Sequence, residues 1–136
     1  MRRVNVIGVG MTKFTSPKAL RPYTEMGQEA LHDALKDAGV DYKEIEHAYV
    51  GWVYADSCAG QKVLYDVGMT GIPIFNVNNN CSTGSNALYL ARQAVASGVV
   101  ECALALGFEQ MTPGALGIVF NDLPIPMFTF FEKLWE

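Results

Sequence analysis

Short apolar runs alternate along this chain with segments of helical character, and this alternation limits the possible folds more than any other feature. Apolar runs with high strand propensity lie at residues 4–9, 48–55, 74–77 and 102–108. Between them, residues 23–38 and 86–97 have helical spacing with glycine stops after them, and residues 61–67 fit a short helix. The resulting β-α-β-α-β-α-β order predicts a layered α/β domain with helices on both faces of a mixed, mostly parallel sheet.

The sheet should bring functional groups to one edge. We expect the first, third and fourth strands to be parallel with right-handed crossovers, while the second, 48–55, can form an antiparallel edge. In open α/β sheets, ligands bind beyond the carboxyl ends of the strands. Residues that follow the third strand, 74–77, are therefore the first place to look for chemistry.

Composition excludes several classes of protein. The 136 residues fit one domain, and 50% hydrophobic with 18% charged residues indicates a packed core. The net charge of −4 without a basic run argues against nucleic acid and anionic membranes as partners. No apolar run is long enough to span a bilayer, and the first residues do not read as a signal peptide. Three widely spaced cysteines indicate a reducing, intracellular compartment and favour neither a disulfide framework nor a metal site.

Cys81 is the leading candidate for chemistry. It follows the third strand and three asparagines, and it precedes a helix that Ser82 or Thr83 can cap. Unpaired N–H groups and the helix dipole at such a turn stabilise a thiolate, which is the nucleophilic form of cysteine. The alternative is a small buried hydrophobe, because free cysteine is often buried. Residue chemistry leaves both open.

No other residue in the chain is a good base for this thiol. A catalytic thiolate is usually activated by a histidine. His32 lies on the polar face of the 23–38 helix, and His47 precedes the second strand, at the opposite end of the sheet from Cys81. We expect both to be surface histidines. Of the other thiols, Cys102 reads as a core residue and Cys58 as incidental in a polar loop.

Three weaker signals have ordinary structural interpretations. Gly8-x-Gly10 resembles the start of a dinucleotide-binding fingerprint, but Lys13 stands where the fingerprint needs its third glycine. This argues against a dinucleotide-binding site. Met111 is a candidate substrate-binding residue, although methionine is more often core filler. The asparagines at 78–80 form a plain turn or a rigid turn that projects the thiol at a fixed angle.

The segment around Cys81 also resembles a known family. Residues 78–85, Asn-Asn-Asn-Cys-Ser-Thr-Gly-Ser, resemble the nucleophile motif of thiolases, with the sterol-carrier-protein type most similar. The likeness covers roughly residues 3–120. Besides the motif, the segments that resemble the family are 6–14, 67–73 and 103–111. Residues 1–120 therefore correspond to a thiolase N-terminal domain. Residues 121–136 match loosely, as the start of a loop domain or a C-terminal tail.

The resemblance implies a reaction. It implies thiolytic cleavage of a 3-oxoacyl-CoA, or the reverse Claisen condensation, through an acyl thioester on Cys81 whose backbone N–H forms part of an oxyanion hole. Coenzyme A would be a co-substrate, with no permanently bound cofactor and no metal. Family members are longer and resemble two copies of this α/β unit. The activating histidine, a second cysteine and most coenzyme A contacts come from parts outside this chain.

We therefore expect a thiolase half that is inactive without a C-terminal half or partner chain, in a homo- or hetero-oligomer. The apolar end of the chain fits this, since Phe128, Phe130, Phe131 and Trp135 need a surface to bury against. The compartment would be peroxisomal in a eukaryote and cytoplasmic in a bacterium. Two alternatives remain: an interaction subunit with a structural Cys81, and a condensing-enzyme or retro-aldol relative.

Overall fold

The computed structural model describes residues 2–19, 21–112 and 133–134. The main elements in these residues are α1 (Tyr23–Ala38), β1 (His47–Gly51), α2 (Ala59–Tyr65), β2 (Ile74–Val77), α3 (Thr83–Ser97) and β3 (Ala103–Gly107). The expected helix at 23–38 and the expected strand at 74–77 have the predicted bounds. The left-handed φ of +68° at Gly39 and +80° at Gly98 ends α1 and α3, as the glycine stops predicted.

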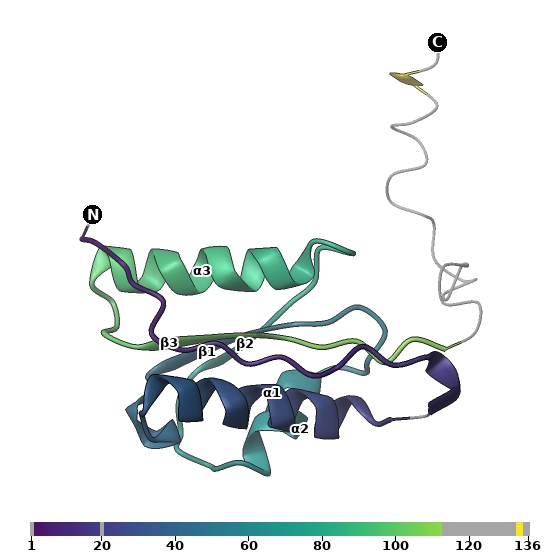
Figure 1. The fold of residues 1–136 in the computed structure, drawn as a ribbon. Helices are drawn as coiled ribbons and strands as arrows, with labels where there is room; N and C mark the ends of the chain where they lie inside the picture. Colours follow the sequence, from purple (N-terminus) through teal and green to yellow (C-terminus); the bar gives the residue numbers. More distant parts are fainter. Residues whose placement is uncertain (1, 20, 113–132, 135–136) are drawn as a thin grey trace.

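The strands form a parallel three-stranded sheet in the order β2-β1-β3. Helices α1 and α2 cover one face and α3 covers the other, which confirms the layered α/β fold (Figure 1). The prediction that the second strand could be an antiparallel edge is wrong. β1 is central and parallel to both neighbours, because all its residues after His47 are buried and both faces are covered.

The predicted first strand, 4–9, is also wrong. These residues pair with no strand among the described residues, and β3 has β1 as its one described neighbour. A strand exists only where another strand satisfies its backbone groups. Instead, the segment runs along α1, where a Cβ at Gly8 or Gly10 would collide with the helix backbone. The apolar side chains of Val6, Ile7 and Val9 are mostly exposed.

Two apolar clusters hold the layers together. The first lies between the sheet and the α1–α2 layer and includes the fully buried Leu31, Val50, Val63 and Leu64. The second lies beneath α3 and is built from small side chains, chiefly Ala87, Ala91 and Ala94, packed on Tyr49 and Val100. Alanines on this face let α3 lie close to the sheet, so the position of its first turn is tightly constrained.

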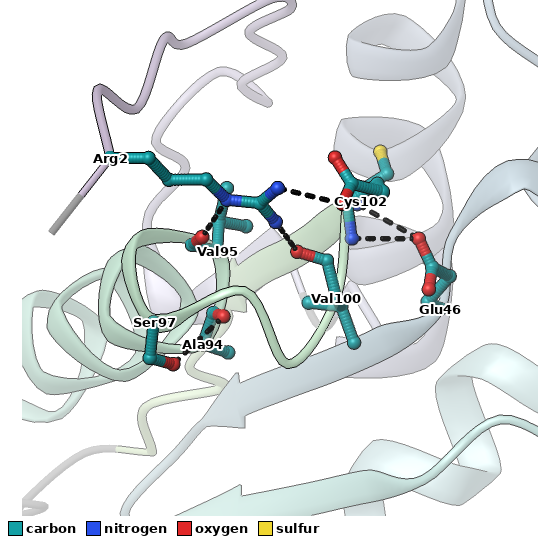
Figure 2. Close-up of polar contacts among 8 residues, drawn as sticks. Arg2, Glu46, Ala94, Val95, Ser97, Val100 and Cys102 are labelled. Atoms are coloured by element: carbon teal, nitrogen blue, oxygen red, sulfur yellow. Dashed lines mark hydrogen bonds and ion pairs between the residues drawn. The ribbon is translucent and has the colours of Figure 1, made fainter.

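Polar contacts at the amino end of the sheet fix the far end of α3 (Figure 2). Arg2 donates from Nε to the Val95 carbonyl and from its guanidinium to the Val100 carbonyl, both at 2.6 Å, and pairs with Glu101 at 2.7 Å. Glu46 Oε1 accepts the backbone amides of Glu101 and Cys102. These contacts tie the chain's first residues and β1 to the turn between α3 and β3.

No helix within the described residues has the length and apolar character needed to cross a bilayer.

Candidate active site

Cys81 lies in the tight turn that joins β2 to α3, at the carboxyl edge of the sheet. Local hydrogen bonds shape this turn: the Asn80 amide donates to Asn78 Oδ1 at 3.1 Å, and Ser82 Oγ donates to the Asn79 carbonyl at 2.7 Å. Asn80 adopts a left-handed conformation with φ +50°, which asparagine tolerates better than most residues. The asparagine run is therefore a folded turn that leads directly into Cys81.

The Cys81 side chain is exposed, and its Sγ lies 3.7 Å from Asn80 Oδ1. The thiol is thus no buried hydrophobe, and packing does not account for its place in the turn. Exposure is what a nucleophile needs to reach a substrate. The catalytic role of Cys81 stays a prediction.

The first turn of α3 presents free amide donors. Ser82 occupies the N-cap position, but its side chain makes no cap hydrogen bond, so the predicted capping by Ser82 is wrong. Its hydroxyl is already donated to Asn79. Among the described residues, the backbone amides of Cys81, Gly84 and Ser85 donate no hydrogen bond. Together with the helix dipole, such amides attract negative charge at this turn.

The other two cysteines have different surroundings. Cys58 is exposed and is the N-cap residue of α2, with a left-handed φ of +61°, so Cys81 is not alone at a helix N-terminus. At α2, however, the Gly60 amide is already bound to Asn76 Oδ1 at 2.8 Å. Cys102 is half-buried, and burial, followed by the nearby charges of Glu46 and Glu44, raises the pKa of its thiol.

The two histidines lie away from Cys81. His32 is exposed on α1, as expected. His47 begins β1 and so lies at the amino edge, but it is half-buried rather than on the open surface. Its Nδ1 lies 3.2 Å from the Tyr49 hydroxyl, and its ring packs edge-on against Phe75. His47 therefore lies at the opposite edge of the sheet from Cys81, and His32 lies in the helix layer on the face opposite α3.

Met111 follows β3 at the same carboxyl edge and is 39% exposed. It lines a cavity of about 50 Å³ with residues of the N-terminal loop, α1 and the β3 exit, and Cys81 is not among the lining residues. That volume holds a few water molecules but no acyl chain. The substrate-binding role of Met111 stays a prediction.

Sequence reasoning missed two polar residues that organise this edge. Glu109, two residues past β3, accepts the amides of Val53 and Tyr54 at 2.8 and 3.3 Å. Asn76, inside β2, accepts the Trp52 indole N–H at 2.9 Å in addition to the Gly60 amide. The sequence did contain a signal for them. Asn76 stands within an apolar strand and Glu109 follows one closely, and polar groups in such places need hydrogen-bond partners.

No group of three histidine, cysteine, aspartate or glutamate side chains suited to a metal ion occurs in the described part of the chain.

Comparison with known proteins places this arrangement in a family. Residues 4–117 match the thiolase N-terminal domain. The chain belongs to the thiolase family. Its α/β layers and the turn at Cys81 are therefore those of a thiolase N-terminal domain, as the motif at 78–85 predicted.

The thiolase chain resembles two curated relatives over most of its own length. It is 55% identical over 129 residues to sterol carrier protein 2 of Homo sapiens, covering 93% of this chain and 24% of that protein. It is 38% identical over 113 residues to a benzoylsuccinyl-CoA thiolase subunit of Thauera aromatica, covering 82% and 29%. The chain thus spans about a quarter of the length of these relatives.

A solved structure shares the fold. The 3-oxoacyl-[acyl-carrier-protein] synthase III of Aquifex aeolicus superposes with a TM-score of 0.63 at 20% identity, covering 76% of this thiolase chain and 44% of the synthase. At that identity the likeness concerns the fold alone.

Proposed function

We propose that this chain is the nucleophile-bearing part of an acyl-CoA thiolase, with Cys81 as the residue that accepts the acyl group. The observation that carries the proposal is the exposed Cys81 thiol in a turn whose neighbouring amides, including those of Gly84 and Ser85, donate no hydrogen bond to any described residue. Family membership supports the same chemistry.

In the proposed reaction, the Cys81 thiolate attacks the 3-carbonyl carbon of a 3-oxoacyl-CoA. The carbonyl electrons move to oxygen, and the Cys81 amide donates a hydrogen bond to that oxyanion. The oxyanion then collapses and the bond between C2 and C3 breaks. The C2 carbanion leaves as acetyl-CoA after protonation, and the shortened acyl group stays on Cys81 as a thioester. The thiol of a second coenzyme A attacks this thioester, releases a shorter acyl-CoA and frees the Cys81 thiolate.

The chain needs further parts to complete this cycle. Proton transfers at the thiol and at C2 require a base, but His47 lies at the amino edge of the sheet and His32 lies in α1, on the face opposite α3. The chain also spans only about a quarter of the length of its relatives. We infer that a C-terminal half or a partner chain supplies the base and most of the coenzyme A contacts, in a homo- or hetero-oligomer. Coenzyme A is a co-substrate in this proposal, and the compartment is peroxisomal for a eukaryotic source and cytoplasmic for a bacterial one.

Selective labelling tests the choice of nucleophile. We expect iodoacetamide to modify Cys81 faster than Cys58 and Cys102 across a pH series, as measured by peptide mapping. Cys58 lies beside a helix amide that Asn76 already occupies, and burial raises the pKa of Cys102. If either of these cysteines reacts faster than Cys81, the assignment is wrong.

Reconstitution tests the reaction. The 136-residue chain mixed with the C-terminal half of a thiolase relative should cleave acetoacetyl-CoA, and Cys81→Ser should abolish this activity while Cys58→Ser retains it. The chain without that half should show no turnover. A Cys81→Ser complex with full activity favours the interaction-subunit alternative, and robust turnover by the chain alone contradicts the half-enzyme proposal.

A further inference from the structure

Thr83 is a buried polar residue directly beside the Cys81 turn. It is 4% exposed, although it opens α3 next to the exposed Cys81 and Ser82. Its hydroxyl has two partners: Oγ1 accepts the Asn79 amide at 2.8 Å and donates to the Asn80 carbonyl at 2.5 Å. One side chain thus binds both residues that precede the nucleophile.

These two bonds span Asn79 and Asn80, and the second holds the peptide plane that leads into Cys81. The left-handed Asn80 lies between the two bonded groups and has several other conformations available in a free chain. The Thr83 backbone amide also donates to the Asn80 carbonyl, at 3.1 Å. With the Asn80 carbonyl held twice, rotation of the Asn80–Cys81 peptide would break both bonds.

The sheet in turn fixes Thr83. A Cβ added at Gly51, the last residue of β1, would lie 2.6 Å from Thr83 Cγ2 and 2.8 Å from the Thr83 carbonyl oxygen. Gly107, paired with Gly51 at the end of β3, also lies near the Gly84 backbone, but less tightly: a Cβ there would be 3.6 Å from Gly84 Cα, an ordinary van der Waals contact. The first turn of α3 therefore sits directly on the ends of two strands.

We propose that Thr83 is the positioning residue for the nucleophile. Packing against Gly51 fixes Thr83, and the Thr83 hydroxyl holds the turn that leads into Cys81. The thiol is thereby kept beside the α3 amides that bind no described residue. The inference rests on the proposed role of Cys81 as the acyl acceptor. Thr83 acts through Cys81 and touches no substrate.

Substitutions at Thr83 test this in the 136-residue chain. Thr83→Val keeps the shape and removes the hydroxyl, while Thr83→Ser keeps the hydroxyl and removes the methyl group. The ratio of the iodoacetamide rates at Cys81 and Cys58 should fall at least about threefold across the pH series in Thr83→Val, since a thiol that moves away from the α3 amides loses stabilisation of its reactive thiolate. It should stay near the wild-type ratio in Thr83→Ser. Cys58 serves as the internal control because it lies at a different helix.

Amide exchange gives a second readout that does not depend on thiol chemistry. The Asn79 amide should be protected from hydrogen exchange in the wild type and in Thr83→Ser, and should exchange much faster in Thr83→Val. A folded Thr83→Val chain with unchanged Asn79 exchange and an unchanged labelling ratio overturns the inference. So does a Thr83→Ser chain that behaves like Thr83→Val, because the hydroxyl then has no special role.

Gly51→Ala covers the case in which Thr83→Val does not fold. It keeps the hydroxyl but pushes Thr83 away from the sheet, so the labelling ratio should fall here too. A folded Gly51→Ala chain with a wild-type ratio overturns the inference. If Cys81 proves no more reactive than Cys58 in the wild type, the proposed function fails, while Asn79 exchange still decides whether Thr83 holds the turn.

Discussion

At the scale of single residues, the structure separates cysteines that look alike in the sequence. Cys58 and Cys81 are both exposed and both precede helices. Their difference lies in a neighbour: Asn76 from β2 occupies an amide at the start of α2, whereas no described side chain occupies those of Gly84 and Ser85 at α3. We therefore predict that thiol reactivity depends on which amide donors remain unoccupied, a property that depends on residues distant in sequence.

The buried hydroxyl of Tyr42 leads to a prediction about the stability of the fold. Its hydroxyl is buried and has no hydrogen-bond partner among the described residues, so it loses its water contacts without replacement. Tyr42→Phe should stabilise the chain by about 1 kcal/mol, the cost expected for an unsatisfied buried group. Urea unfolding at pH 7 measures this. Tyr49→Phe is the matched control, since the Tyr49 hydroxyl contacts His47 and its loss should not stabilise the chain.

The same hydroxyl makes a prediction at alkaline pH. Burial raises the pKa of Tyr42 above its ordinary value of 10.0, so the folded chain keeps its proton where the unfolded chain releases it. The folded state binds more protons, and stability therefore falls as the pH rises through about 10 and above. Tyr42→Phe should lose less stability between pH 9 and pH 11 than the wild type. An equal loss in both proteins would contradict this assignment.

At the scale of elements, α3 is held at both ends by different means. Its first turn sits on glycines at the ends of β1 and β3. In its last turn, the Val95 carbonyl accepts a hydrogen bond from Arg2 Nε and the Ala96 carbonyl accepts one from the Arg2 backbone amide. The positive charge of Arg2 also suits the negative end of the helix dipole (Figure 2). The helix that carries the candidate nucleophile is therefore anchored by residues from both ends of the described chain.

Removing the Arg2 contacts should loosen this helix. We expect Arg2→Ala to lower the free energy of unfolding by about 1 kcal/mol, because two charge-assisted hydrogen bonds to backbone carbonyls are lost. Glu101→Gln is the control, since it removes the exposed ion pair and keeps both carbonyl contacts, and such pairs contribute little. Urea unfolding compares the two variants. Equal effects would mean that the ion pair, rather than the capping of α3, is responsible.

At the scale of the whole molecule, the two faces of the sheet are covered by unequal numbers of described helices. Helices α1 and α2 share one face of the sheet, while α3 is the one described helix on the other (Figure 1). Apolar side chains on α3 remain exposed: Leu88 by 56%, Tyr89 by 58% and Leu90 by 37%. The segment before α1 also exposes Val6, Val9 and Phe14. Apolar surface on this scale is typical of a buried interface rather than of a free domain.

We therefore predict that the isolated chain associates. Light scattering on fresh material should give a dimer or larger species rather than a monodisperse 14.9 kDa monomer. Replacing Leu88 and Tyr89 with arginine should reduce this association, whereas arginine at the polar, exposed Ser97 should not. A monomeric wild-type chain at high concentration would contradict the prediction. The aromatic residues at 128, 130, 131 and 135, which supported it in the sequence, lie outside the described residues.

Local patterns in the sequence determined several features by themselves. The spacing of apolar residues and the glycine after it set the bounds of α1, and the run at 74–77 set β2, because helix periodicity and stop signals act over a few residues. The motif at 78–85 pointed to the thiolase family and located Cys81 between a strand and a helix. All of these depend on neighbours in the chain.

Tertiary structure alone decided the features that depend on distant partners. Residues 4–9 have the composition of a strand but pair with none among the described residues, since strand formation requires a neighbour. β1 is central because β2 and β3 pair with its two edges. The buried Thr83 hydroxyl beside Cys81, seated against Gly51 more than thirty positions earlier, joins segments that no local pattern connects. Local propensity thus placed the candidate nucleophile, and long-range packing decided what holds it there.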